Sequence, residues 1–117
     1  MAPLQPPSTD EILLLRERVS VHNPGVGLID TRTGLIYLRP ASTFDGGDHL
    51  GLAEAVLGIH DISQAGDLRG FIVLPDSGGW KIVNVSGLNP HEHKMEKPLF
   101  NAAAVLLESL LGHCSTE

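Results

Sequence analysis

Six histidines occur in this chain of 117 residues, and several of them lie beside acidic side chains. His91 and His93 flank Glu92 in one polar segment. A second group surrounds a short apolar segment: Asp45, Asp48, His49, His60 and Asp61. Imidazole and carboxylate groups bind zinc and other divalent ions, but the spacing matches no His-Glu-x-x-His helix and no Cys/His ribbon. Together these residues form a candidate ligand or partner loop, with ordinary surface histidines as the simpler alternative.

Other chemistry-bearing patterns are weaker. Gly46 and Gly47 precede a helical segment, where anions can bind, but aspartates flank them, so Asp48 is interpreted as a helix N-cap. Ser86-Gly87 lacks the Gly-x-Ser-x-Gly pattern of a nucleophile elbow. Cys114 has no neighbouring base and is interpreted as part of a frayed tail. The sequence therefore identifies no catalytic residue and no cofactor, and it favours a protein that is not an enzyme.

The elements that must position these residues are three helices and two hairpins. Ser8 and Glu11 have capping-box spacing, which predicts a helix over 9–20. A second helix is expected from His49 to Leu57, between Asp48 and Gly58. A third is expected over 98–111, ending at Gly112. Hairpins are predicted over 26–38, where Gly34 requires positive φ, and over 68–86.

This order, αββαββα, predicts an α+β fold. We expect a four-stranded, mainly antiparallel sheet with helices packed on one face. The strands of the first hairpin are apolar on both faces, so at least one should be covered on two sides. The predicted organisation is a flexible proline-rich arm over 1–8, one domain over 9–112, and a tail over 113–117.

The last helix is apolar nearly all round. The residues expected to face the core lie along one side of the helix, whereas Phe100, Ala104 and Leu111 lie on other sides. A domain of this size has few other residues that could cover those sides. We therefore expect these three residues to form an interface with a second copy or with a protein partner.

The composition argues against several classes of function and location. Fourteen acidic residues against eight basic ones give a net charge of −6, which argues against nucleic-acid binding and against anionic membranes. No apolar run is long enough to span a membrane, the first residues do not resemble a signal peptide, and a single cysteine indicates no disulfide framework. A cytoplasmic location is expected.

Three short motifs resemble those of C-terminal modules of bacterial polymorphic toxins. They are His49-x-x-Leu52, Ala65-Gly66-Asp67-Leu68 and Asn84-x-Ser86-Gly87-x-x-Pro90, which together cover about a third of the chain. Asp67 stands where the family has Glu, and Leu88-Asn89 stands where it has His-Tyr. The resemblance implies a place in bacterial toxin–immunity conflict, and any family activity that depends on the His-Tyr pair would not carry over to this chain.

Three functions compete on these grounds. The favoured one is a small acidic binding protein, such as an immunity or adaptor protein of a toxin system. The alternatives are a toxin-type enzyme acting on a nucleotide or nucleic acid, and a metal-dependent enzyme using Asp45, His49, His91 and His93. The last requires the loops after the second and fourth strands to meet at one end of the sheet, and loops at opposite ends are the simpler arrangement.

Overall fold

The computed structural model describes residues 3–61, 64, 66–84 and 97–116. In chain order, the elements are α1 (Thr9–Arg18), β1 (Gly25–Asp30), β2 (Ile36–Pro40), the 3-10 turns η1 (Ala41–Thr43) and η2 (Asp45–Gly47), α2 (His49–Leu57), β3 (Leu68–Asp76), β4 (Gly79–Asn84), α3 (Lys97–Leu111) and β5 (Cys114–Thr116). The α+β class predicted from the sequence is therefore confirmed.

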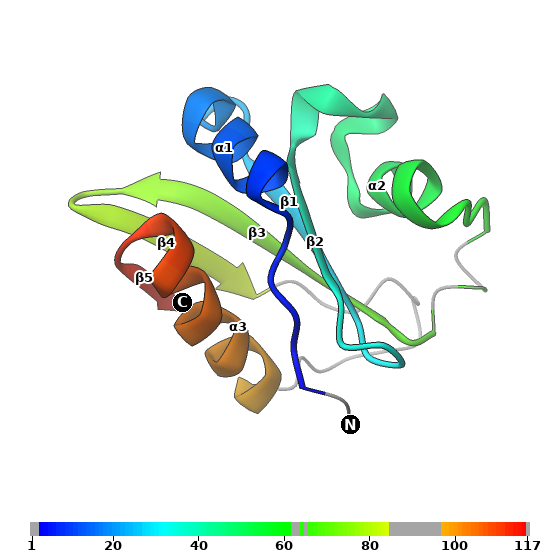
Figure 1. Cartoon of the computed structure of the whole chain (residues 1–117). Coiled ribbons are helices and arrows are strands. Elements are labelled where there is room, and N and C mark those ends of the chain that lie inside the picture. Colours follow the sequence, from blue (N-terminus) through cyan, green and yellow to red (C-terminus); the bar gives the residue numbers. More distant parts are fainter. Residues whose placement is uncertain (1–2, 62–63, 65, 85–96, 117) are drawn as a thin grey trace.

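The strands form one mixed sheet in the order β2-β1-β3-β4-β5 (Figure 1). The β1–β2, β1–β3 and β3–β4 pairs are antiparallel, and β4–β5 is parallel. The prediction of four strands missed β5, because three residues are too short to show a strand periodicity. The predicted tail over 113–117 is wrong for Cys114–Thr116, which pair with Trp80–Ile82.

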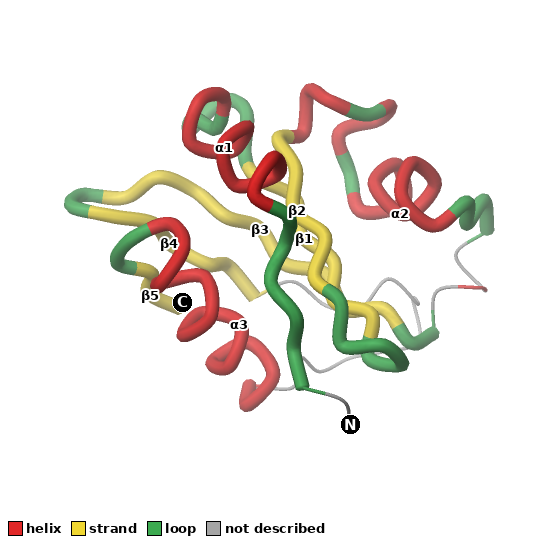
Figure 2. The backbone as a smooth tube through the Cα atoms, viewed as in Figure 1, coloured by secondary structure: helices red, strands yellow, loops and turns green. Residues whose placement is uncertain are grey.

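The prediction of helices on one face of the sheet is also wrong. Helices α1 and α3 lie on one face, and α2 lies on the other (Figures 1 and 2). Every residue of β1 is buried, as expected of a strand covered on two sides. Val26 and Leu28 pack toward α2, whereas Ile29 packs into the core under α1 and α3.

The helix ends follow the predicted capping chemistry. Glu11 N donates to Ser8 Oγ at 3.2 Å, and Ser8 N donates to Glu11 Oε1 at 3.4 Å, which completes the capping box of α1. The helix ends two residues earlier than predicted, because Asn23 Nδ2 donates to the carbonyl oxygen of Arg18 at 3.1 Å and turns the chain.

Glycine ends the other elements where the sequence predicted. Gly34 has φ 75°, which confirms the first hairpin turn. Helix α2 has the predicted bounds: Gly51 N donates to the Asp48 carboxylate at 2.8 Å, and Gly58 has φ 69°. Gly112, after α3, has φ 99°.

The prediction that Phe100, Ala104 and Leu111 face away from the core is wrong. Their side chains are 1%, 8% and 7% exposed and pack in the core cluster under α1 and α3. Phe100 meets Phe71 edge to face, with ring centroids 6.2 Å apart. Helix α3 packs against the sheet and α1, and its six buried residues all belong to this one core cluster. Its exposed large apolar side chain is Val105.

Trp80 holds the C-terminal end of the described chain against the sheet. Its backbone N donates to the His113 carbonyl at 2.7 Å, and its indole Nε1 donates to the Leu111 carbonyl at 2.9 Å. Burial raises the pKa of Cys114 to about 11, and the nearby Glu108 carboxylate acts in the same direction. The thiol is therefore protonated near neutral pH.

The described part of the proline-rich arm packs against the fold, unlike the flexible arm that was predicted. Gln5 N donates to the Gly34 carbonyl at 2.8 Å, and Pro7 is buried. Nearby, Leu38 N at the edge of β2 donates to Glu11 Oε2 at 3.0 Å. These contacts satisfy groups of an edge strand that would otherwise be open to pairing with another chain.

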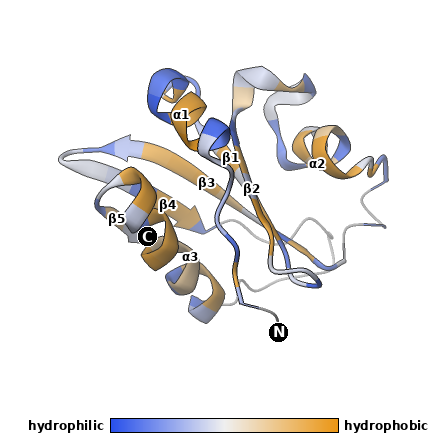
Figure 3. Cartoon of the chain, in the orientation of Figure 1, coloured by the Kyte–Doolittle hydropathy of each residue, from blue (hydrophilic) through white to orange (hydrophobic). Residues whose placement is uncertain are grey.

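Figure 3 shows both polar and apolar residues on α1 and α2, whereas α3 is apolar over most of its length. Within the described residues, no helix has the length and apolar character needed to cross a membrane.

Candidate functional site

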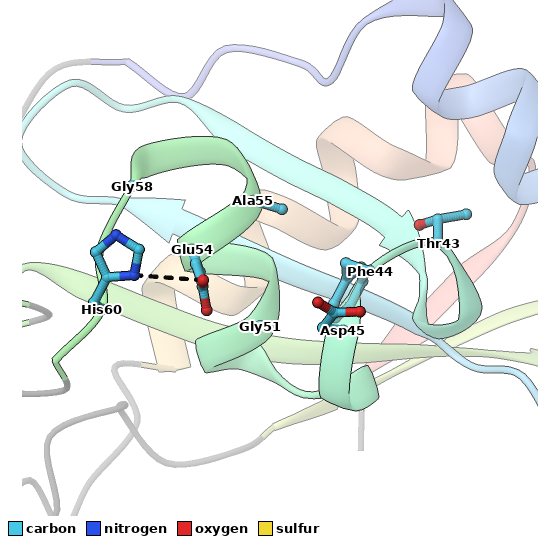
Figure 4. Close-up of a pocket in the computed structure, with 8 residues that line it drawn as sticks. All are labelled: Thr43, Phe44, Asp45, Gly51, Glu54, Ala55, Gly58 and His60. Atoms are coloured by element: carbon cyan, nitrogen blue, oxygen red, sulfur yellow. Dashed lines mark ion pairs between the residues drawn. The ribbon is translucent and has the colours of Figure 1, made fainter.

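An open cleft of about 490 Å³ lies between α2 and the turns that precede it. Its lining residues are Thr43, Phe44, Asp45, Gly51, Glu54, Ala55, Gly58 and His60. Figure 4 shows Glu54 and His60 on one side of Gly51, with Phe44 and Asp45 on the other. The cleft therefore presents carboxylates, an imidazole and one aromatic ring on the outer side of the α2 layer.

Gly51 brings the two walls of the cleft together. A Cβ at this position would lie 1.9 Å from the Asp45 carbonyl oxygen and 3.1 Å from the Phe44 ring. Glycine within a helix costs about 1 kcal/mol relative to alanine. The close approach of η2 to α2 is the reason that α2 carries glycine at its third residue.

The charge of the cleft is acidic. Glu54 Oε1 lies 3.4 Å from His60 Nδ1, and both side chains are more than half exposed. A pair this exposed contributes little to stability, so Glu54 remains accessible to another cation. Between Arg39 and Arg69 the chain carries five acidic residues and no lysine or arginine. This segment is therefore acidic along the sequence, and Asp67 near its end is paired with Arg32, whose Nε lies 3.6 Å from Asp67 Oδ2.

Two of the predicted site residues are committed to the fold. Asp48 caps α2 through Gly51 N. His49 turns toward the sheet, where its Nε2 donates to the Phe71 carbonyl oxygen at 3.1 Å. A Cβ at Gly70 would lie 2.6 Å from His49 Cδ2, so the imidazole rests directly on the backbone of β3.

Burial lowers the pKa of His49, against the opposing effects of the Phe71 hydrogen bond and the Asp48 carboxylate. The neutral ring is therefore favoured in the folded chain. His49 attaches α2 to β3, and its ring does not enter the cleft.

Of the remaining predicted site residues, the structure describes three and leaves two outside the described ranges. Asp45 and His60 line the same cleft, and Asp61 is exposed just beyond His60. His91 and His93 lie outside the described residues, as do residues 85–90 of the third toxin-like motif. A shared site joining His49 to His91 stays a prediction. Among the described residues, no group of three or more His, Cys, Asp or Glu could hold a metal ion.

A second charged cluster, at the end of β1, is structural. Asp30 is 2% exposed and accepts from Arg32 N at 3.0 Å and from Arg32 Nε at 3.3 Å. Burial alone would raise the pKa of Asp30, but the hydrogen bonds and charge of Arg32 bring it below its ordinary value. The carboxylate is thus fully engaged in holding the β1–β2 turn.

The sequence analysis missed Phe44, Gly51 and Glu54 as members of the site. Gly51 offered a signal, since glycine inside a helical pattern lowers helix stability and often has a packing reason. Glu54 is the only charged residue of α2, and an isolated charge on an apolar helix marks its outward face. Phe44 gave no comparable signal.

Comparisons with known proteins were made at three levels: protein families, curated proteins and solved structures. No protein-family model, curated protein or solved structure matches the chain.

Proposed function

We propose that this chain is a small acidic binding protein that acts by protein–protein contact, as an immunity or adaptor protein of a bacterial toxin system does. The α2 cleft receives a basic segment of the partner. The observation that carries the proposal is a cleft lined by Asp45 and Glu54 in a stretch of chain without lysine or arginine.

The form of the cleft suits a long basic side chain. Lysine and arginine have apolar stems that pack along apolar surfaces while their charged heads remain near water. Phe44 and Ala55 supply apolar contact surface, and Asp45 and Glu54 supply negative charge around the glycine between them. Phe44 also offers a ring face on which a guanidinium can stack.

The charge of the layer favours fast and selective encounter with a basic partner. Complementary fields raise association rates and disfavour partners of like charge, and salt screens both effects. A partner bound at this cleft should therefore dissociate more readily as ionic strength rises.

A titration with a defined peptide tests the proposal. The probe is acetyl-Gly-Arg-Leu-Arg-Gly-amide, and the matched control replaces both arginines by glutamates. We expect the basic peptide to shift backbone NMR signals of residues 43–45, 51–55 and 58–60, with weaker shifts in high salt. Equal shifts from both peptides, or shifts spread over α1 and α3, would contradict the assignment of the cleft.

Expression in a bacterial host tests the biological side of the proposal. An immunity or adaptor protein should leave growth unchanged when the chain is induced alone. Growth arrest on induction would overturn the immunity assignment and favour the toxin-type enzyme.

A further inference from the structure

The turn that ends helix α2 holds His60 beside Glu54. Gly58, in the left-handed region, donates from its N to the Glu54 carbonyl oxygen at 3.1 Å. Ile59 N donates to the Ala53 carbonyl oxygen at 3.4 Å. Hydrogen bonds of this kind turn the chain back on itself at the end of a helix. Ile59 then packs against the core under α2, which fixes the position of the backbone at His60.

The pair formed by His60 and Glu54 has two charge states. His60 Nδ1 lies 3.4 Å from Glu54 Oε1, and both residues line the acidic cleft (Figure 4). Histidine is the residue type whose charge ordinarily changes near neutral pH. A neutral imidazole leaves the charge of Glu54 available to another cation. An imidazolium neutralises that charge and adds a positive charge of its own to the cleft.

The other charged groups near His60 are acidic. Asp45 lies across the cleft on η2, and Asp61 is the next residue in the chain. An ordinary aspartate or glutamate keeps its charge between pH 8 and about pH 6. His49, on the first turn of α2, points to the sheet, and burial lowers its pKa, so it takes up a proton at lower pH than an ordinary histidine. Over this range the changing charge in the cleft is therefore that of His60.

From this geometry we infer that His60 makes the cleft sensitive to pH: protonation of its imidazole weakens binding of a basic segment at Glu54. The inference rests on the proposed function, because the imidazolium and an arginine of the partner compete for one carboxylate. Both side chains of the pair are more than half exposed, so the effect is a few-fold change in affinity. By linkage, a bound basic segment makes His60 harder to protonate by the same factor.

The chain provides a matched pair outside the cleft. His113 Nδ1 also lies 3.4 Å from a carboxylate oxygen, Glu108 Oε1, and both side chains are similarly exposed. This pair follows the end of α3, on the other side of the sheet from α2, and does not line the cleft. A general effect of pH on net charge acts on both pairs, whereas the inferred effect acts through His60.

The dissociation constant of acetyl-Gly-Arg-Leu-Arg-Gly-amide at about pH 8 and about pH 6 tests the inference. This peptide has no group that titrates in that range, so a change in affinity comes from the protein. We expect the native chain and His113→Gln to bind about threefold more weakly at the lower pH. His60→Gln, which does not titrate, should bind equally at both.

NMR signals of the imidazole rings give the reciprocal measurement. Saturating peptide should move the midpoint of the His60 titration to lower pH by about half a pH unit, which corresponds to the same threefold factor. The midpoint of the His113 titration should not move. Because the His60 side chain is 74% exposed, His60→Gln should unfold at the temperature of the native chain.

The outcomes separate this inference from the proposed function. Equal weakening of the native chain and His60→Gln at the lower pH overturns the role of His60 and leaves the cleft as the binding site. Native affinity that does not change with pH has the same meaning. A native chain that does not bind the peptide at either pH overturns the proposed function and this inference together.

Discussion

The two faces of the sheet differ in the size of the core that covers them. On one face, α1 and α3 cover a large core that includes Phe71, Phe100 and Leu107. On the other, the nine-residue α2 covers a smaller core around Leu28 and Leu52. The charges of the helices differ too: α1 and α3 carry both signs, whereas the single residue of α2 that is Asp, Glu, Lys or Arg is Glu54.

In the function proposed above, this difference separates the part of the fold that supplies stability from the part that binds a partner. The α1 and α3 side supplies most of the buried apolar area, which is the main source of folding free energy. The α2 side carries an open cleft and a glycine in the first turn of its helix, and glycine lowers helix stability relative to alanine. In the proposed function these features are tolerated because they serve binding.

The largest expected effect of a substitution is on the α1 and α3 side. A Cβ at Gly27 would lie 2.2 Å from the ring of Phe71, which is fully buried. Gly27→Val should therefore lower the free energy of unfolding by about 3 kcal/mol, at the upper end for overpacked cores. Urea denaturation measures this, and a loss below about 0.5 kcal/mol, as for ordinary surface changes, would show that the ring has room to move.

A smaller effect is expected in the cleft. Gly51→Ala places a methyl group against the Asp45 carbonyl oxygen and should cost about 1–2 kcal/mol despite the better helix propensity of alanine. The same variant should weaken binding of the basic peptide, because the two walls move apart. The control is Gly66→Ala, where a new methyl group meets nothing within 4 Å. Equal behaviour of the two variants would contradict the close approach of η2 to α2.

A still smaller effect on stability is expected from the protonation of His49, which attaches α2 to the sheet. The pKa of His49 is lowered by burial in the folded chain, so the unfolded chain takes up a proton first as the pH falls below about 6.5. The stability that neutral His49 contributes is complete above that pH and is lost as the pH falls toward its folded pKa.

His49→Gln provides the control for this pH effect, because glutamine can still donate to the Phe71 carbonyl but does not titrate. Urea denaturation at pH 7.5 and 5.5 should show a larger loss for the native chain than for the variant. Equal losses would mean that other groups cause the pH dependence.

Much of the fold could be predicted from local chemistry. The capping box at Ser8, the positive φ of Gly34 and the bounds of α2 all follow from side-chain preferences that act within a few residues. The failures concern contacts between distant segments. Which face α2 covers, and whether α3 is enclosed, depend on how the sheet twists and on what packs above it.

The site was predicted only in part for the same reason. Asp45 and His60 were identified by residue type, but their meeting with Glu54 depends on the backbone contact at Gly51. His49 has the residue type of a ligand, yet Gly70 leaves room for its ring on the sheet and assigns it a structural role. Side-chain direction, which sequence spacing alone did not reveal, separates these two histidines.

The most direct test of the account compares two charge reversals that alter net charge equally. Glu54→Lys changes the cleft, and Glu17→Lys changes an exposed position of α1. The measurement is the dissociation constant of the basic peptide, with sedimentation equilibrium as a check on association. We expect Glu54→Lys to weaken peptide binding about tenfold, a change of about 1.4 kcal/mol, and Glu17→Lys to leave it within twofold. Equal weakening by both variants would show that net charge alone attracts the peptide, and would contradict a binding site on the α2 face.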